Sequence, residues 1–346
     1  THFLDEYKLI DQNFSGIFKH KRVLDIGSND GSFLEVFKNK SWKAIGVDPA
    51  KAPADEANLK GIKTLIGYFD LSLKDKILDY LGGPPSLVTM YNAFAHIDNI
   101  DDVLSNIVEI LDNENPSIFR FEVQYVGALI DNLLIQSIFH EHISHYSLVS
   151  LSRFLSKHDF VMIDASTNSI QHGSLVVSST HKRNIDKFNP SKSLNKLLIN
   201  ESTKANVYLN ALSEMDQRIK RRKDCINKIL TSMHQNNSII AGYGAARSAS
   251  TIISQLEINK YLKFVYDNNE KKYNLYIAGE GIQIRSEVFL EEDFPVAIVI
   301  LAWVHNKVII EKLRNYISRG GKVISLFPLL EIHSNKGVET IRFVKK

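Results

Sequence analysis

Three histidines, a glutamate and a tyrosine lie within eight residues near the middle of this 346-residue chain, at 139–146 (FHEHISHY). Two imidazoles beside a carboxylate can supply a base near neutral pH together with the group that sets its tautomer. Single histidines in soluble proteins are mostly structural, so it is the crowding that indicates proton-transfer chemistry. Because the run lies between two Gly-rich segments, we interpret it as a catalytic linker that faces ligands held on both sides.

The first Gly-rich segment follows an apolar strand expected at residues 22–26 and reads Asp25-x-Gly27-x-Asn29-x-Gly31. This spacing differs from the G-x-G-x-x-G of dinucleotide-binding folds and is typical of S-adenosylmethionine (SAM) enzymes. Asp48 ends the next expected strand, roughly 20 residues after the turn, where a doubly wound sheet carries its ribose-binding acid. We therefore predict a SAM site in which Asp25 positions the turn and the cofactor's amino group, the turn approaches the cofactor, and Asp48 binds the ribose.

Asn92 and His96 follow another buried strand, expected at residues 86–91. In SAM enzymes the end of this fourth strand lies beside the reactive methyl group, so both residues are expected to shape that pocket. His96 could equally cap a helix expected at 101–111. A fifth strand at 117–123 and a closing hairpin that ends at 171–178 complete the sheet of a methyltransferase.

A second α/β unit begins near residue 238, after a long polar helical stretch at 191–233. Its turn contains Tyr243, Gly244 and Arg247, and the helix that follows could hold a phosphate through its first N–H groups. Arg247 replaces the third glycine of a dinucleotide fingerprint, so a nucleotide or sugar phosphate fits better than NAD. Asp267 ends the next strand, and Trp303, after a later strand, either stacks on a base or fills the core.

Composition excludes several partners. The 42 Lys and Arg nearly balance the 39 Asp and Glu, so the net charge of +3 gives no reason to invoke nucleic acid or an anionic membrane. The basic run 218–223 (RIKRRK) keeps helical phase and is interpreted as a solvated helix face. The longest apolar run, 296–304, is about half of a membrane span. One cysteine, Cys225, is compatible with a reducing compartment, so we expect a cytoplasmic protein without a metal site.

At this point the chain resembles a known family, the SAM-dependent C-methyltransferases of nucleotide-linked 4-keto-deoxysugars. The order and spacing of several motifs along nearly the whole chain carry the resemblance. They are residues 25–31 (DIGSNDG), 92–97 (NAFAHI), 140–142 (HEH), 146–148 (YSL), 172–175 (HGSL), 243–246 (YGAA) and 301–303 (LAW).

The resemblance implies an α/β fold, with a Rossmann-like methyltransferase domain at 1–185, a helical connector at 186–236 and a smaller Rossmann-like domain at 237–346. It implies methylation of the sugar alpha to its ketone through an enolate, with His142 as general base and Glu141 as the acid that assists it. The second domain would help to bind the nucleotide sugar. The residues expected to contact that substrate are His172, Tyr243, Gly244, Arg247, Asp267 and Trp303.

Two features depart from the family. Its members usually carry an N-terminal zinc-binding domain and a tyrosine-rich segment, and Phe139 stands where they have a tyrosine. We expect either a fragment, a separate or truncated N-terminal zinc-binding segment, or an altered mechanism. The alternatives to C-methylation are O- or N-methylation of a related sugar, or a nucleotide-sugar binding module without catalysis.

Overall fold

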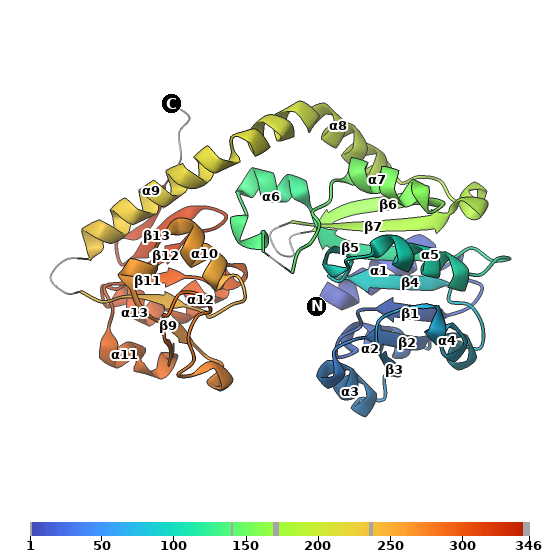
Figure 1. The fold of residues 1–346 in the computed structure, drawn as a ribbon, viewed down its shortest axis with the longest axis horizontal. Helices are drawn as coiled ribbons and strands as arrows, with labels where there is room; N and C mark the ends of the chain where they lie inside the picture. Colours follow the sequence, from blue (N-terminus) through green and yellow to red (C-terminus); the bar gives the residue numbers. More distant parts are fainter. Residues whose placement is uncertain (1, 140, 169–172, 235–237, 342–346) are drawn as a thin grey trace. The chain divides into compact units, whose positions relative to one another are not determined.

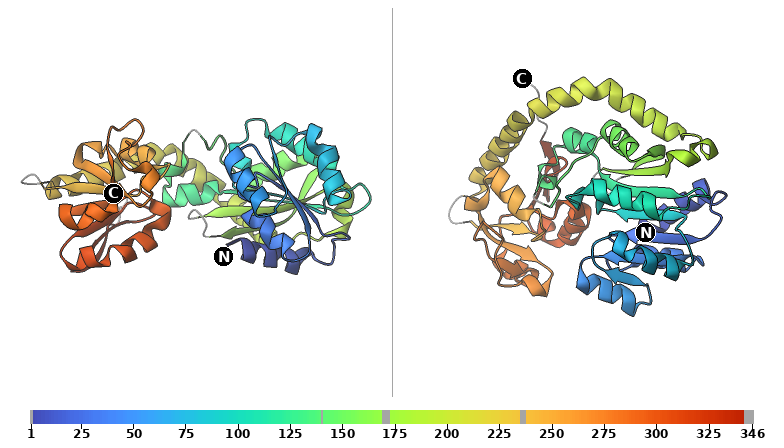
Figure 2. Two further views of the ribbon diagram at one scale, coloured as in Figure 1. Left: turned by 90° about the horizontal axis from the view of Figure 1, so that it is seen from below. Right: turned by 45° about the vertical axis from the view of Figure 1, so that its right-hand side comes forward.

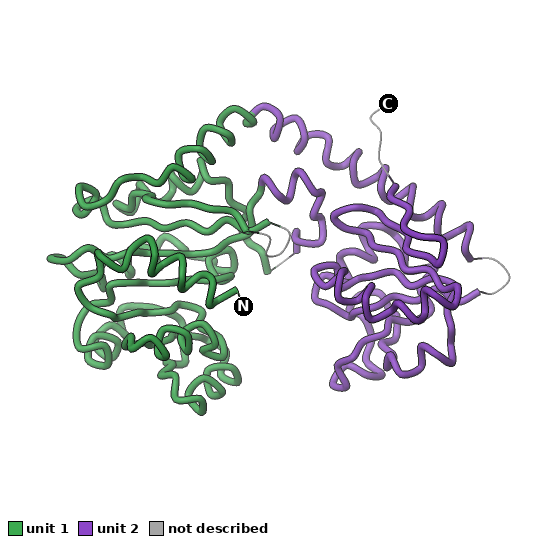
Figure 3. The backbone as a smooth tube through the Cα atoms, turned by 180° about the vertical axis from the view of Figure 1, so that it is seen from behind, with its two compact units in different colours: residues 1–126, 141–205 green, residues 127–140, 206–346 purple. Residues whose placement is uncertain are grey.

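The computed structural model describes residues 2–139, 141–168, 173–234 and 238–341 of the chain. These residues form two compact units, residues 1–126 with 141–205 and residues 127–140 with 206–346 (Figure 3). The helix α8 (Lys192–Ser213) begins in the first unit and ends in the second, and α9 (Met215–Met233) follows it. Within the described residues, no helix is both long enough and apolar enough to cross a membrane.

The first unit is built on a seven-stranded sheet with the order β3-β2-β1-β4-β5-β7-β6 (Figure 1). β1 to β5 run parallel, whereas β7 is antiparallel to both β5 and β6. The expected closing hairpin is thus confirmed as the pair β6 and β7. The strand bounds are β1 (Arg22–Ile26), β2 (Lys43–Asp48), β3 (Thr64–Ile66), β4 (Leu87–Tyr91), β5 (Ile118–Gln124), β6 (Phe160–Asn168) and β7 (Ser174–His181).

Helices cover both faces of this sheet (Figure 2). One face packs against the apolar sides of α4 (Lys74–Leu81), α5 (Ile100–Ile110) and α7 (Leu148–Lys157). The other face packs against α1 (His2–Phe14), α2 (Ser32–Lys38) and α3 (Lys51–Leu59). Because both faces are covered, the central strands read as nearly continuous apolar runs, which is why their positions could be predicted.

Polar side chains interrupt β5 on the face that α1 covers. Arg120 is 1% exposed and donates to Glu6 of α1 at 2.8 Å, to the hydroxyl of Tyr91 at 3.0 Å and to Ser178 at 2.7 Å. The Tyr91 hydroxyl in turn donates to Glu6 at 2.7 Å. Burial alone would lower the pKa of Arg120, but the acidic partners around the guanidinium raise it. This buried network fixes α1 on the sheet.

The second unit contains another seven-stranded sheet, ordered β10-β9-β8-β11-β12-β13-β14. β8, β9, β11 and β12 are the expected parallel strands. The short strand β10, parallel to β9, and the antiparallel pair β13 and β14 were not predicted from sequence. The strands are β8 (Ile240–Tyr243), β9 (Leu262–Asp267), β10 (Ile284–Ser286), β11 (Ala297–Ile300), β12 (Lys322–Ser325), β13 (Leu330–Ser334) and β14 (Gly337–Ile341). The helices are α10 (Ala249–Leu256), α11 (Leu290–Asp293), α12 (Asn306–Lys312) and α13 (Arg314–Ser318), with α6 (Val126–Asn132) contributed from the middle of the chain.

Candidate active site

The turn after β1 is held in a left-handed conformation. Gly27 and Gly31 have φ of 77° and 74°, and Asn29 has φ of 49°. The backbone N–H of Asn29 donates to Oδ2 of Asp48 at 2.8 Å, and the N–H of Ala50 donates to Oδ1 of the same carboxylate at 2.8 Å. Asp48 thus lies against the turn at the carboxyl end of β2, as the sequence predicts.

Asp25 is buried beneath this turn, with 3% of its surface exposed. The hydroxyl of Thr89 on β4 donates to its Oδ1 at 2.6 Å. The pKa of Asp25 is raised to about 7, mainly because the carboxyl is buried; the Thr89 hydrogen bond opposes the increase, and the nearby charge of Asp48 adds to it. A buried carboxylate of this kind suits a cationic group, because the cation would restore the charged form.

Replacing Asp25 by asparagine is expected to stabilise the protein without ligand at pH 8 and to change little near pH 4. The folded-state pKa lies above the unfolded value of 3.8, so ionisation of Asp25 costs stability progressively between pH 4 and 7 and fully above pH 7. The gain at pH 8 should be on the order of 2–4 kcal/mol. Urea unfolding of both proteins at pH 4, 6 and 8 measures it, and an equal difference at all three pH values would contradict the effect.

The turn after β4 lies directly against the turn after β1. Asn92 has a φ of 55°, and its N–H donates to the carbonyl of Glu122 on β5 at 3.2 Å. A Cβ added at Gly27 would lie 2.6 Å from the Cβ of Ala93, a separation that real Cβ atoms essentially never show. The glycine is therefore required by the contact between the two turns as well as by its backbone conformation.

His96 ends the short 3-10 helix η2 (Phe94–His96) and binds the histidine-rich segment. Its Nδ1 lies 2.6 Å from the carbonyl oxygen of Glu141, which makes Nδ1 the donor. The N–H of Ile143 donates to the carbonyl of Ala95 at 3.0 Å. The alternative that His96 caps the helix after residue 100 is wrong, because Asn99 supplies that cap to α5.

These contacts bring His142 beside the turn after β4. Its ring centroid lies 4.9 Å from that of His96 and 6.0 Å from that of His145. His96 is exposed, and the two other rings are partly buried. The structure thus places the predicted base in a row of three imidazoles, next to the strand end where the reactive methyl group was expected.

His145 differs from the other two rings. Its Nε2 is buried and accepts or donates no hydrogen bond among the described residues. Burial lowers the pKa of His145, and the neighbouring His142 lowers it further. His145 is therefore neutral at neutral pH, and sequence analysis offered no sign of this buried nitrogen beyond the crowding of the run.

A carboxylate from α8 anchors the other end of the segment. Glu201 is 4% exposed and accepts the N–H groups of Leu148 and Val149, both at 2.8 Å, at the start of α7. It also accepts the hydroxyl of Tyr125 at 3.0 Å, and Tyr125 forms a parallel bridge with Tyr146. Ser147 completes the helix start through a capping box. The sequence did not indicate Glu201, because its partners are more than fifty residues away.

The remaining predicted residues of the histidine-rich run are distributed differently. Phe139 is described and belongs to the second compact unit, whereas Glu141 and His142 belong to the first. His140 and His172 lie outside the described residues.

In the second unit, the predicted substrate residues occupy two different environments. Tyr243 and Trp303 are each 5% exposed, and the Tyr243 hydroxyl donates to Glu287. A Cβ at Gly244 would lie 2.3 Å from the Cβ of Ala302, so this glycine is required by packing. Arg247 is exposed beside them.

Asp267 repeats in the second unit the arrangement of Asp48 in the first. Its Oδ2 accepts the N–H of Ala245 at 2.7 Å, and its Oδ1 accepts the N–H of Asn269 at 2.8 Å. A cation that sequence analysis missed accompanies it here. Lys272 donates to the carbonyl of Ala245 at 3.0 Å and lies 3.4 Å from Oδ2 of Asp267. The turn after β8 thus carries a partly neutralised acid.

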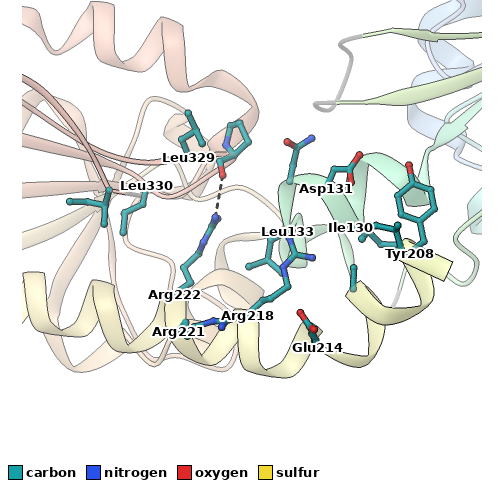
Figure 4. A pocket seen from close by; sticks show the side chains of 15 residues that line it. Ile130, Asp131, Leu133, Tyr208, Glu214, Arg218, Arg221, Arg222, Leu329 and Leu330 are labelled. Atoms are coloured by element: carbon teal, nitrogen blue, oxygen red, sulfur yellow. Dashed lines mark hydrogen bonds between the residues drawn. The ribbon is translucent and has the colours of Figure 1, made fainter. Parts of the chain in front are cut away.

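The second unit also contains a cavity of about 570 Å³ that none of these predicted residues lines (Figure 4). Arg218, Arg221 and Arg222 of α9 face it, together with residues of α6 and the segment around Leu329. Arg222 is 6% exposed and donates to the carbonyls of Leu326 at 2.9 Å and Pro328 at 3.2 Å, and its burial lowers its pKa to about 10. The interpretation of residues 218–223 as a solvated face is therefore wrong for Arg222, whose guanidinium fixes the end of β12.

Two family models match consecutive parts of this chain. The family described as "Methyltransferase domain" matches residues 4–165, and the "C-methyltransferase C-terminal domain" matches residues 169–328. The C-methyltransferase NovU of Streptomyces niveus is 27% identical over 307 residues, which cover 88% of this chain and 72% of that protein.

Solved structures of other methyltransferases are more distant. Magnesium protoporphyrin IX methyltransferase of Synechocystis PCC 6803 with bound S-adenosylhomocysteine (SAH) is 15% identical, with a TM-score of 0.40, and covers 52% of this chain and 82% of its own. A SAM-dependent methyltransferase of Aquifex aeolicus is 13% identical, with a TM-score of 0.37, and the match covers 51% of this chain and 89% of that one.

The residues of the first unit fit the SAM cofactor that such enzymes use. The left-handed turn at residues 27–31 contains two glycines, whose backbone a ligand can approach closely. Asp25 offers a buried carboxylate for a cation, and Asp48 lies at the end of β2. A methyltransferase domain is followed by a C-methyltransferase C-terminal domain, in the order that the motifs predicted. The chain is a SAM-dependent methyltransferase whose C-terminal part matches the C-methyltransferase C-terminal domain.

Proposed function

We propose that the enzyme methylates a nucleotide-linked 4-keto-deoxysugar on the carbon alpha to its ketone, with His142 as the general base. One observation carries the proposal. The ring centroid of His142 lies 4.9 Å from that of His96, at the turn after β4. In methyltransferases the acceptor meets the cofactor at this end of the sheet. A base is needed there because a carbon next to a ketone becomes nucleophilic only after it loses a proton.

The proton balance follows from this arrangement. A neutral His142 takes the alpha proton, and the electron pair of the C–H bond moves into an enolate whose oxygen carries the negative charge. SAM, when bound, supplies the sulfonium methyl group that the enolate carbon accepts, and SAH remains. Glu141 assists by orienting or stabilising the imidazolium that forms, and donors near the ketone oxygen stabilise the enolate.

In the same proposal, the turn after β1 holds the cofactor. Asp25 binds the ammonium group of its amino-acid part, Asp48 binds the ribose, and Gly27, Asn29 and Gly31 let the backbone approach. Asn92 and His96 shape the pocket around the methyl group. The raised pKa of Asp25 and the contact of Asp48 with the turn support these roles.

The second unit is proposed to bind the nucleotide part of the substrate. Arg247 and Asp267 lie at the turn after β8, and Gly244 keeps this turn close to Ala302. The buried Tyr243 and Trp303 would shape the site from below, and His172 is proposed to contact the sugar. Lys272 adds a cation that suits a phosphate.

Exchange of the alpha proton with solvent tests the reaction type. In deuterium oxide with SAH in place of SAM, the enzyme is expected to replace the alpha proton of a bound 4-ketosugar nucleotide with deuterium, because enolate formation needs no methyl donor. Mass spectrometry of a panel of thymidine-, uridine-, cytidine- and guanosine-diphosphate ketosugars measures the exchange. Methylation without exchange at the alpha carbon would instead favour an oxygen or nitrogen acceptor, and neither exchange nor methylation with the whole panel would favour a binding module.

We also propose a cytoplasmic location for the enzyme. Cys225 is a free thiol in the structure, which is consistent with the reducing conditions of the cytoplasm. Among the described residues, no group of three or more His, Cys, Asp or Glu side chains is arranged to hold a metal ion. We propose a nucleotide sugar, rather than nucleic acid or a membrane, as the partner of this enzyme.

A further inference from the structure

A second histidine–carboxylate pair lies in the first unit, outside the histidine-rich run. Nε2 of His2, the first residue of α1, lies 2.8 Å from Oε2 of Glu122 on β5. Glu122 is fully buried, and its other oxygen accepts from Asn168 at 3.3 Å. The His2 side chain keeps 24% of its surface exposed. The pair thus holds a partly accessible imidazole at one end and a fully buried acid at the other.

The position of this pair connects it to both turns of the cofactor site. Glu122 pairs in register with Tyr91, the last residue of β4, and its carbonyl accepts the N–H of Asn92. The His2 ring centroid lies 6.2 Å from that of Tyr91, and the Tyr91 ring lies 4.6 Å from that of Phe33, at the start of α2. His2 therefore lies by the end of β4 and the helix that follows the turn after β1.

The charge of His2 is set by its surroundings. Its hydrogen bond with Glu122 raises the pKa of the imidazole, and the charges of Glu122, Glu6 and Asp5 raise it further, whereas burial lowers it. Tyr91 faces the ring from β4 and is uncharged, because burial raises its pKa. His2 is therefore more cationic than an ordinary histidine. Glu122 engages Nε2, which leaves Nδ1 as the second N–H donor of the imidazolium.

The cofactor needs such a donor. The amino-acid part of SAM carries a carboxylate as well as an ammonium group, and the acids Asp25 and Asp48 suit only the cationic part and the ribose. Lys60, a cation near the turn after β1, is already engaged by Asp30 at 3.0 Å and by Glu56 at 2.8 Å. An imidazolium held by a buried acid provides a charge-assisted hydrogen bond without a long flexible side chain.

We infer that His2, oriented by Glu122, binds the carboxylate of the cofactor's amino-acid part. This assignment rests on the SAM cofactor and not on the sugar substrate. Its test therefore needs only cofactor products, and its failure would leave the proposed ketosugar chemistry untouched.

The test compares two ligands by calorimetry. SAH carries the carboxylate, and decarboxylated SAH keeps the amine and the thioether but lacks it. At pH 7, His2→Gln is expected to weaken binding of SAH by about 10- to 100-fold, the range of a hydrogen bond to a charged group, and to leave binding of decarboxylated SAH within about twofold. His2→Arg, which keeps a cation, should retain most of the preference for SAH.

Glu122→Gln tests the orienting residue and the charge. This change removes the main cause of the raised His2 pKa, so the preference for SAH should be lost at a lower pH than in the unaltered enzyme. In both proteins the preference is expected to fall as the pH rises through the His2 pKa, because the imidazolium is lost. The midpoint should lie above 6.5 in the unaltered enzyme and move downwards in the variant.

A matched control lies elsewhere in the same unit. Nε2 of His158, the residue after α7, lies 2.7 Å from Oδ1 of Asp101 on α5, so His158→Gln removes a histidine–carboxylate pair of the same kind. This variant should bind both ligands as the unaltered enzyme does. Equal losses for SAH and decarboxylated SAH in His2→Gln, or no loss for either, would overturn the assignment.

Discussion

Replacing His142 by alanine is expected to lower kcat for methyl transfer by about 10²- to 10⁴-fold, the usual contribution of a general base. The affinity for SAM should change by less than about twofold, because the ring lies beside His96 and not in the turn after β1, which is proposed to hold the cofactor. The alpha-proton exchange with SAH should fall by the same factor as methyl transfer, since both need the enolate. Steady-state kinetics, calorimetry and the exchange assay measure the three quantities.

His158→Ala provides the control for this change. It removes an imidazole that is paired with Asp101 of α5 in the same unit. Its kcat should remain within about twofold of the unaltered enzyme. More than a tenth of the original kcat in His142→Ala would reject His142 as the base. Loss of SAM affinity in the same variant would indicate that the segment at 141–147 had moved.

Replacing Arg120 by methionine is expected to cost about 3–5 kcal/mol of unfolding free energy, the largest stability effect we predict for this chain. The substitution leaves Glu6, which is 4% exposed, without its guanidinium partner. Asp164, whose Oδ2 lies 3.7 Å from the same guanidinium, loses its partner as well. The double variant Glu6→Gln with Arg120→Met should recover part of the loss, because the uncompensated carboxylate is removed. Urea unfolding of Arg120→Met, Glu6→Gln and the double variant measures the coupling.

An exposed ion pair serves as the comparison. Lys51 and Asp55 lie 2.6 Å apart on α3, with side chains 77% and 48% exposed. Replacing Lys51 by methionine should cost less than about 1 kcal/mol. Similar losses for Lys51 and Arg120 would contradict the view that burial determines the value of the pair at Arg120.

Features that depend on neighbouring residues, such as strands and the Gly-rich turn, could be predicted from the sequence. Apolar runs located the longer parallel strands of both sheets but not the three-residue strands β3 and β10. The spacing of Gly27 and Gly31 indicated a turn that is proposed to bind the cofactor, and its backbone is left-handed. The family resemblance implied His142 as the general base, and the structure places it beside His96, whose Nδ1 donates to the carbonyl of Glu141.

Contacts between residues that are far apart in the sequence could not be predicted from local patterns. His2 and Glu122 are 120 positions apart, and Arg120 lies 114 positions from Glu6, so neither pair forms a motif. An arginine and a glutamate in the strand at 117–123 gave no sign of which helix would cover them. The same holds for Arg222, whose neighbours in sequence suggested solvent and whose carbonyl partners lie more than 100 residues away.

The contact between Gly27 and Ala93 limits how this enzyme can be redesigned. Because a Cβ at residue 27 would lie 2.6 Å from that of Ala93, the two positions share one fixed volume. A library that enlarges residue 93 to change the acceptor is expected to displace the turn at residues 27–31, which is proposed to bind the methyl donor. Residues 27 and 93 are therefore best kept small in any library aimed at new acceptors.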